Sequence, residues 1–256
     1  WPARFLLDLM ERNPGVRYVN SSACVDRVRS IKDEYEKEKM RESSRINDAC
    51  MEKAAAFVKE GMTEKECADY IRSLYKEEGC EEGFETIISF GANAADPHHE
   101  PDDTVLKAGD CIVIDMGCRK DGYCSDMTRT IALGYVSEKM DKVYHTVLEA
   151  QLAGIAATKA GVTGKAMDAA ARKVIDDAGF VGCFGHSYGH SLGLLIHEAP
   201  NASMRNDKPM PAGAVVSAEP GIYIPDEFGV RIEDVTVITD TGCEILTKSP
   251  KNLIIL

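Results

Sequence analysis

Two aspartates lie within apolar segments of the chain. Asp115 ends the run C-I-V-I-D, and Asp126 follows in C-S-D-M-T-R-T. The turn K-D-G at 120–122 predicts a tight hairpin centred between residues 120 and 121, which would make the two aspartates cross-strand partners. Two carboxylates that close repel each other unless one is protonated, an arginine pairs with it, or a cation lies between them.

Two glutamates repeat this arrangement later in the chain. Glu219 lies in S-A-E-P-G-I-Y-I and Glu233 in V-R-I-E-D-V, on either side of a turn at 225–229. We expect them to face each other across a second hairpin if one strand carries a one-residue bulge. Buried carboxylates are costly unless they are paired or bind a metal. All four carboxylates together favour a metal site over four unrelated strand positions.

The histidines are clustered as well. Five of the six fall in two short stretches, His98 and His99 in one and His186, His190 and His197 in the other. The sixth, His145, is alone on an expected helix, and we interpret it as structural. Four carboxylates with one imidazole form an oxygen-rich site that suits Mn²⁺, Co²⁺ or Zn²⁺ with positions left for water. A pair of metal ions matches the expected carboxylate spacing.

The elements that carry these residues occur twice in the same order. Helical patterns at 31–61 and 63–79 precede strands at 84–90, 111–116 and up to 134, and helical patterns at 137–160 and 163–179 precede strands at 213–224 and 229–239. Residues 61–79 also align without gaps with 161–179, although repeated helix caps alone could explain part of this match. We therefore expect an internal duplication and an α+β fold, with sheets around a central site and helices outside.

Composition excludes several other classes. The 256 residues include 42 acidic and 30 basic side chains, and the net charge of −12 argues against a nucleic-acid surface. No apolar run reaches the roughly 18 residues of a membrane helix, and no signal peptide is evident. The nine cysteines form no C-x-x-C pair, so we expect reduced thiols in a cytoplasmic protein. The chain begins with Trp1, which suggests a fragment of a longer protein.

The motifs resemble those of a known enzyme family. I-D-M-G, S-D-M-T-R-T, G-H-S-L-G-L-L-I-H-E-A-P, E-P-G-I-Y and R-I-E-D occur here in the order found in the pita-bread metallopeptidases, and the similarity covers about residues 30–250. That family comprises methionine aminopeptidases, Xaa-Pro aminopeptidases and prolidases. Arg231 two residues before the last glutamate, and His186 ahead of His190, resemble the Xaa-Pro branch. Ser191 stands where that family often has glycine.

The resemblance implies a role for each candidate residue. One metal would be held by Asp115 and the other by His190 and Glu219, with Asp126 and Glu233 bridging both. The implied cofactor is a pair of divalent ions, manganese in the first place, with cobalt or zinc as alternatives. Water activated by the metals would attack the carbonyl before proline, and Glu219 would carry its proton to the departing amine.

The remaining candidates would contact the substrate. By the same resemblance, His197 and His98 would steady the scissile carbonyl, although His99 could take the place of His98. Arg231 and His186 would shape the proline pocket. Thr128 would support a bridging aspartate.

The expected protein is therefore an exopeptidase that acts on proline-containing peptides at the bond between the first residue and proline. A methionine aminopeptidase and a metal-free binding module of the same fold are the alternatives. Residues 29–256 would form the catalytic domain, and residues 1–28 would be a linker or the tail of an N-terminal domain, which family members of this branch carry. That domain often builds a homodimer, so a homodimer is a further expectation.

Overall fold

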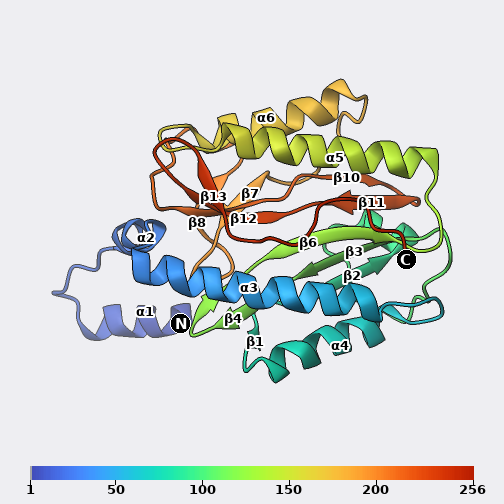
Figure 1. Ribbon diagram of the computed structural model, residues 1–256. Helices are drawn as coiled ribbons and strands as arrows, with labels where there is room; N and C mark the ends of the chain where they lie inside the picture. Colours follow the sequence, from blue (N-terminus) through green and yellow to red (C-terminus); the bar gives the residue numbers. More distant parts are fainter. Residues whose placement is uncertain (1) are drawn as a thin grey trace.

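Helices cover the outside of curved sheets in the computed structural model, which describes residues 2–256 (Figure 1). The first half contains the helices α3 (Glu34–Phe57) and α4 (Glu64–Glu77) and the strands β1 (Glu81–Glu82), β2 (Ile87–Phe90), β3 (Cys111–Met116), β4 (Cys118–Lys120), β5 (Tyr123–Cys124) and β6 (Met127–Ala132). A 3₁₀ helix, η1 (Gly91–Ala95), follows β2. Strands β2, β3 and β6 form one antiparallel sheet.

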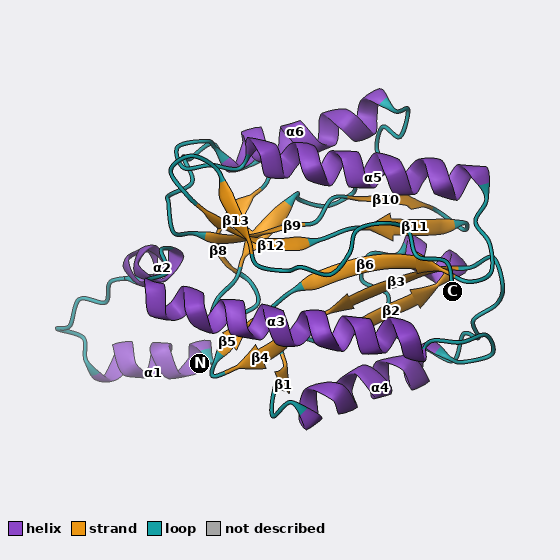
Figure 2. Ribbon diagram, in the orientation of Figure 1, coloured by secondary structure: helices purple, strands orange, loops and turns teal. Residues whose placement is uncertain are grey.

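The second half repeats this order. It contains the helices α5 (Glu138–Ala157) and α6 (Gly164–Asp177) and the strands β7 (Gly189–Ser191), β8 (Glu198–Ala202), β9 (Val215–Ala218), β10 (Gly221–Ile224), β11 (Phe228–Arg231), β12 (Asp234–Ile238) and β13 (Cys243–Ile245). Its main sheet has the order β13-β12-β9-β7-β8, and β10 pairs with β11. In Figure 2, α5 and α6 lie on one side of the strands and α3 and α4 on the other. The expected α+β fold is confirmed.

Local contacts recur at an offset of one hundred residues. Thr63 and Thr163 each cap the helix that follows, with their hydroxyls accepting backbone N–H bonds. Gly61 and Gly161 precede them with φ of 86° and 84°, a conformation that favours glycine. The two segments even bridge the chain in the same way, at Thr63–Val105 and Thr163–Pro209. These repeated contacts confirm the duplication expected from 61–79 and 161–179.

Each half has its own hydrophobic core. Ile71 and Tyr75 of α4 pack in a cluster with Ile112 and Ile114 of β3. In the second half, Val147 of α5 packs in a separate cluster with residues of α6, β9 and β11. Since each helix pair buries its apolar face on its own sheet, the inner strands are left to meet at the seam between the halves.

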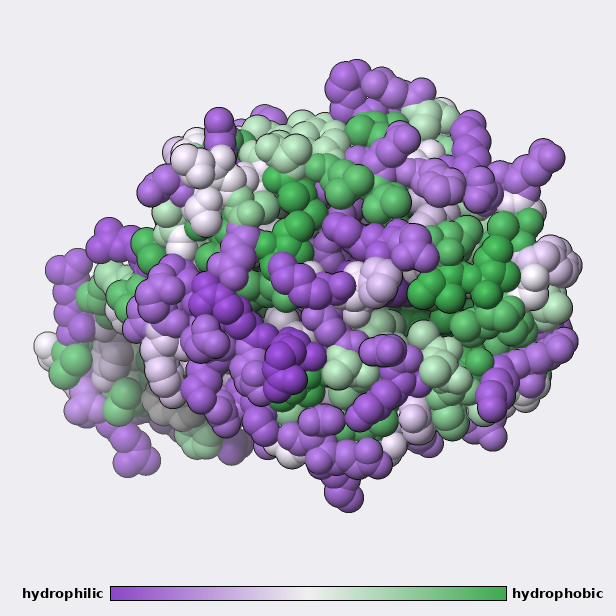
Figure 3. Space-filling view, in the orientation of Figure 1, coloured by the Kyte–Doolittle hydropathy of each residue, from purple (hydrophilic) through white to green (hydrophobic). Residues whose placement is uncertain are grey.

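The C-terminal segment closes onto the first half. Ala132 of β6 donates to the Ile254 carbonyl and accepts from Leu256 N–H, so the last residues extend that sheet. Near the C terminus, apolar side chains gather on the surface between α3 and α5, whereas most of the visible helix surface is hydrophilic (Figure 3). Among residues 2–256, no helix is both long enough and apolar enough to span a membrane.

The N-terminal residues form two helices. α1 (Ala3–Arg12) has no buried residue. α2 (Ser22–Ser30) packs near β8, where Glu198 binds Arg29 of α2 and the buried Lys32. The division of the chain at residues 28 and 29 falls within α2, and it stays a prediction.

Candidate metal centre and active-site cavity

The register of the first hairpin differs from the expected one. Asp115 of β3 pairs with Thr128 of β6, so the prediction that Asp115 and Asp126 are direct cross-strand partners is wrong. Asp121 and Gly122 both have positive φ and form the two-residue turn, which moves the centre of the hairpin one residue along the chain. Asp126 lies two residues before Thr128. The two aspartates are therefore diagonal neighbours on one face of the sheet.

The second hairpin places its two glutamates opposite each other. β9 pairs with β12 through Ala218 and Asp234, and β10 pairs with β11 through Gly221 and Arg231. Continuing either ladder toward the other would pair Glu219 with Glu233. The two glutamates therefore face each other as expected, and the bulge we expected is absent. The expected strands 213–224 and 229–239 are each interrupted here. One cause is Pro220, which has no N–H to donate to the ladder.

Nine of the candidate residues from the sequence line one cavity of about 310 Å³. They are His98, Asp115, Asp126, His186, His190, His197, Glu219, Arg231 and Glu233. Phe84, Ile87 and Ile196 add apolar walls. Segments far apart in the sequence therefore meet at one cavity, whose lining includes both charged and apolar side chains.

His190 is oriented toward the carboxylates. Its Nε2 lies 3.4 Å from Asp126 Oδ2 and 3.5 Å from Glu219 Oε1. Its Nδ1 is 3.2 Å from the Ser191 carbonyl, which can only accept, so Nδ1 carries hydrogen and Nε2 faces the cluster. Burial lowers the pKa of His190, but the Asp126 hydrogen bond and the Glu219 charge outweigh it and raise the pKa to about 9. The cluster thus attracts positive charge at Nε2, where a metal ion would replace the proton.

The positive charge around the buried carboxylates is too small to balance their negative charges. Burial, with repulsion from neighbouring carboxylates, raises the pKa of Asp115 to about 6 and of Glu219 to about 7, and it raises the pKa of Glu233 well above the ordinary range. Asp115 Oδ1 is buried and has no hydrogen-bond partner within residues 2–256. Ligand atoms of Asp126, His190 and Glu233 lie within 4.8 Å of one another. This donor set and the unpartnered oxygen fit divalent cations.

Arg231 organises the wall beside the cluster. Its Nη2 donates to Asp115 Oδ2 at 2.7 Å and its Nε donates to Thr128 Oγ1 at 3.0 Å. Thr128 in turn donates to Glu233 Oε2 at 2.7 Å. Thr128 therefore supports the glutamate, and the expectation that it supports a bridging aspartate is wrong. This partner of Thr128 could not be predicted from the sequence, because Glu233 comes from the other half of the chain. In the strand register Thr128 lies opposite Asp115, yet its hydroxyl donates to Glu233.

Tyr223 is a site residue that was not among those expected from the sequence. Its hydroxyl accepts from Arg231 Nη1 at 2.9 Å and donates to His186 Nε2 at 2.7 Å. His186 Nδ1 donates to the Ser187 carbonyl, and burial with the nearby Arg231 charge lowers the pKa of His186 to about 3, so the ring is neutral. Tyr223 lies four residues after Glu219, and this even spacing along an extended segment was a signal for a shared face.

Ser217 is a second missed residue. Its hydroxyl accepts from His190 N–H at 2.9 Å and donates to Glu219 Oε1 at 3.0 Å. It is fully buried and lies two residues before Glu219, so the same even spacing pointed to it. Ser217 thereby links β7, which carries His190, to Glu219 directly after β9.

The structure also separates the adjacent histidines. His98 lines the cavity, whereas His99 Nε2 is 2.8 Å from Glu64 Oε2, outside the lining of this cavity. His197 stacks edge-on against His190, with ring centroids 4.3 Å apart. Burial, with the His190 charge, lowers the pKa of His197. His145 is exposed on α5 near Asp141, as a structural interpretation predicts.

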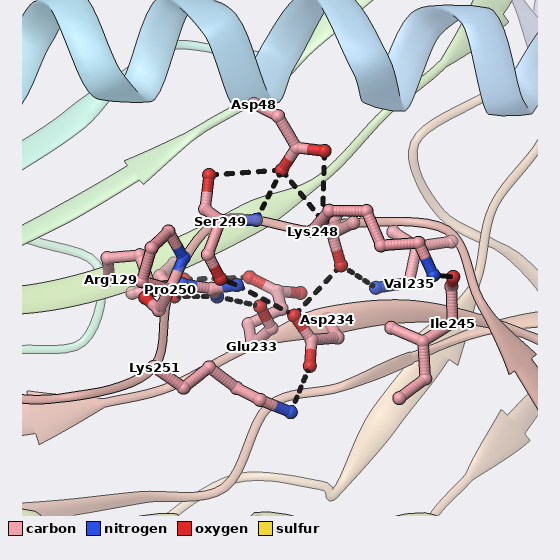
Figure 4. Close-up of polar contacts among 12 residues, drawn as sticks. Asp48, Arg129, Glu233, Asp234, Val235, Ile245, Lys248, Ser249, Pro250 and Lys251 are labelled. Carbon is pink, nitrogen blue, oxygen red and sulfur yellow. Dashed lines mark hydrogen bonds and ion pairs between the residues drawn. The ribbon is translucent and has the colours of Figure 1, made fainter.

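A polar network lies behind Glu233. Asp234 accepts there from both Arg129 and Lys251, and Asp48 of α3 accepts from the backbone of Lys248 and Ser249 (Figure 4). It joins α3, β6, β12 and the C-terminal segment beside a candidate metal ligand.

Comparison with known proteins defines the class. Residues 38–240 match the metallopeptidase family M24. The chain belongs to this family, and the resemblance noted in the sequence is confirmed.

Individual relatives agree with this assignment. An uncharacterized peptidase of Staphylococcus aureus is 41% identical over 238 residues, which cover 91% of this chain and 68% of the relative. The structure of an X-Pro aminopeptidase from Thermotoga maritima has a TM-score of 0.93 and 38% identity, covering 98% of this chain and 72% of that one. The prolidase of Pyrococcus horikoshii has a TM-score of 0.96 and 37% identity, with coverages of 99% and 74%.

Proposed function

We propose that this chain is a two-metal exopeptidase that hydrolyses the bond between an N-terminal residue and proline. The observation that carries the proposal is the convergence of four carboxylates and His190 on one cavity, with Asp115 Oδ1 buried and unpartnered within residues 2–256. The names of the structural relatives, an X-Pro aminopeptidase and a prolidase, support the same substrate class.

The metal ligands would be the five residues of the cluster. Asp115 would hold one ion, His190 and Glu219 the other, and Asp126 and Glu233 both. The ions would supply Lewis acidity, which makes water a nucleophile near neutral pH and polarises a carbonyl. Carboxylate and imidazole ligands without thiolates favour Mn²⁺, with Co²⁺ or Zn²⁺ as alternatives.

The chain's own groups would perform the proton transfer and hold the carbonyl. Glu219, which accepts a hydrogen bond from the Ser217 hydroxyl, would take a proton from water and pass it to the departing amine. His197 and His98 line the same cavity and would donate to the oxygen that becomes negative in the transition state.

Proline would occupy the apolar side of the cavity. Its ring is apolar, and its nitrogen in a peptide bond has no hydrogen, so a pocket for it needs apolar walls and no acceptor opposite that nitrogen. Phe84 and Ile87 offer such walls. His186 is neutral and Arg231 has donors committed to Asp115, Thr128 and Tyr223, so both would shape the pocket as fixed walls.

A peptide panel with several metals tests the proposal. Ala-Pro, Ala-Pro-Ala and Met-Ala-Ser are incubated with protein loaded with Mn²⁺, Co²⁺ or Zn²⁺, and products are separated by chromatography. We expect cleavage of the two proline peptides and loss of cleavage with chelator. Equal or faster cleavage of Met-Ala-Ser would instead support a methionine aminopeptidase. Protein that retains no metal and is not stabilised by Mn²⁺ would support a binding module.

Two further expectations accompany this function. A homodimer would give twice the chain mass in sedimentation. A location in the cytoplasm agrees with nine free cysteines, none of them in a disulfide among residues 2–256.

A further inference from the structure

Glu64, at the start of α4, is a buried carboxylate outside the metal cluster. Its side chain is 0% exposed. Oε1 accepts from Phe90 N–H at 2.7 Å and from Asn93 Nδ2 at 3.0 Å. Oε2 accepts from Asp102 N–H at 3.0 Å and lies 2.8 Å from His99 Nε2. Burying a carboxylate is expensive without such partners, so these four contacts together stabilise Glu64 in its buried position.

All four partners belong to one segment of the chain. Residues 90–102 leave β2, pass through η1 and carry His98 into the active-site cavity. Between Asn93 and His99, two of the residues that Glu64 binds, the His98 N–H donates to Asp96 Oδ1 and the Pro97 carbonyl accepts from Arg231 Nη1. Glu64 therefore fixes both ends of a loop whose middle contributes His98 to the site.

The same cluster does not serve as a second metal site. Glu64, His99 and Asp102 bring possible ligand atoms within 4.8 Å of one another. However, each Glu64 oxygen already accepts two N–H bonds, which uses the lone pairs that a cation would need. The arrangement is a hydrogen-bonding centre.

The second half uses a comparable device for His186. Asp168 of α6 is fully buried, binds Arg172 and accepts from Tyr188 N–H at 3.0 Å. Arg172 donates to the carbonyls of Phe184 and His186. In each half, a buried carboxylate on the second helix holds the segment that brings a histidine to the cavity. Because the same arrangement occurs in both halves, we infer that these carboxylates help to position the two histidines.

We propose that Glu64 is a positioning residue that acts on the peptidase reaction through His98. The proposal rests on the proposed function, because it takes His98 as a substrate-binding group. Without the carboxylate, residues 90–102 lose their shared anchor and His98 no longer occupies one position. A displacement of about 1 Å at a catalytic group can cost on the order of 100-fold in rate.

A double-mutant cycle tests this. Metal-loaded wild type, Glu64→Gln, His98→Ala and the double variant are compared in kcat/KM for Ala-Pro-Ala, and bound metal is measured in each. We expect Glu64→Gln to lower kcat/KM by about 10-fold or more with unchanged metal content. We expect the double variant to match His98→Ala within about 2-fold, because the Glu64 effect passes through His98. Full additivity, or wild-type activity of Glu64→Gln, would overturn the proposal.

Two other variants guard against a general loss of stability. Glu66→Ala removes the capping-box partner of Thr63 on the same helix without touching the loop, and we expect wild-type kcat/KM. His99→Ala removes only one of the four contacts to Glu64, at a partly exposed side chain, and we expect a smaller loss of the same kind. A loss in Glu66→Ala equal to that in Glu64→Gln would show a stability effect and refute positioning.

Hydrogen exchange separates this proposal from the proposed function. The amides of Phe90 and Asp102 donate directly to Glu64, so Glu64→Gln should speed their exchange while Glu66→Ala should not. Wild-type protein that cleaves no proline peptide would end the proposed function alone. Unchanged exchange in Glu64→Gln would end the positioning proposal alone.

Discussion

Arg129 and Asp234 form a buried ion pair across the seam between the two halves, with Arg129 Nη2 2.8 Å from Asp234 Oδ1 (Figure 4). Arg129 lies on β6 and Asp234 on β12. The other N–H groups of Arg129 donate to carbonyls, which are those of Thr128, Glu233, Ser249 and Pro250. All five donors are thus used. Because Arg129 Nη1 donates to the carbonyls of both Thr128 and Glu233, we expect the geometry of the candidate metal site to depend on this arginine.

We expect Arg129→Lys to destabilise the protein by about 3 kcal/mol. An ammonium cannot reproduce the planar set of five donors, so buried carbonyls and Asp234 lose partners. Urea unfolding measures the change. Arg45→Lys, at a largely exposed pair with Glu42, is the matched control and should shift stability by less than about 0.5 kcal/mol. Equal effects at both positions would contradict the role of Arg129.

Asp126→Asn should weaken binding of both metal ions. The amide keeps the shape of the side chain but removes a charge from the group formed with His190 and Glu233. Loss of a ligand should lower metal affinity by about 100-fold or more. Elemental analysis after dialysis gives the metal content per chain. Asp121→Asn in the exposed turn of the same hairpin is the control, and full metal content in Asp126→Asn would refute the assignment.

Gly189→Ala should disrupt the strand that carries His190. A Cβ at Gly189 would lie 1.9 Å from the Ser217 carbonyl oxygen, so β7 would have to move away from β9. We expect the free energy of unfolding to fall by about 3 kcal/mol, and thermal unfolding measures this change. At Gly185, four residues earlier, an added Cβ meets nothing within 4 Å. Gly185→Ala should therefore unfold like the wild type, and a larger loss there than at Gly189 would contradict the packing described.

Glu198 should make stability depend on pH below neutrality. Burial raises the pKa of Glu198, but the Leu195 N–H together with Lys32 and Arg29 outweighs burial and holds it below the ordinary 4.5. The folded state therefore binds this proton less readily than the unfolded chain. The stabilisation is present above pH 4.5 and is lost as the pH falls through the folded pKa.

Glu198→Gln tests this dependence. We expect the variant to be less stable than wild type by about 2 kcal/mol at pH 7, and the gap to narrow below pH 4.5. Urea titrations at several pH values measure the gap. Glu60→Gln, at an exposed loop position, should show little gap at any pH. A gap for Glu198→Gln that grows as the pH falls would reverse the sign and refute the linkage.

Much of the fold was predictable because its signals are local. Helix caps such as Thr63 with Glu66, and apolar periodicity within each helix, depend on residues a few positions apart. The hairpin register was harder. The Asp121-Gly122 turn was present in the sequence, yet a shift of one residue at its centre replaced Asp126 with Thr128 as the partner of Asp115.

The chemical types in the site could be read from the sequence, because carboxylates in apolar segments need a positive partner and buried imidazoles need hydrogen-bond partners wherever they lie. The duplicated order of elements could be read there as well, since each helix pair carries its own apolar face. The choice between the two adjacent histidines came from the packed structure, in which His98 lines the cavity while His99 contacts Glu64. The packed structure also shows that Thr128 supports Glu233. These choices depend on contacts between segments 35 and 105 residues apart, where packing and strand register act and local pattern carries no information.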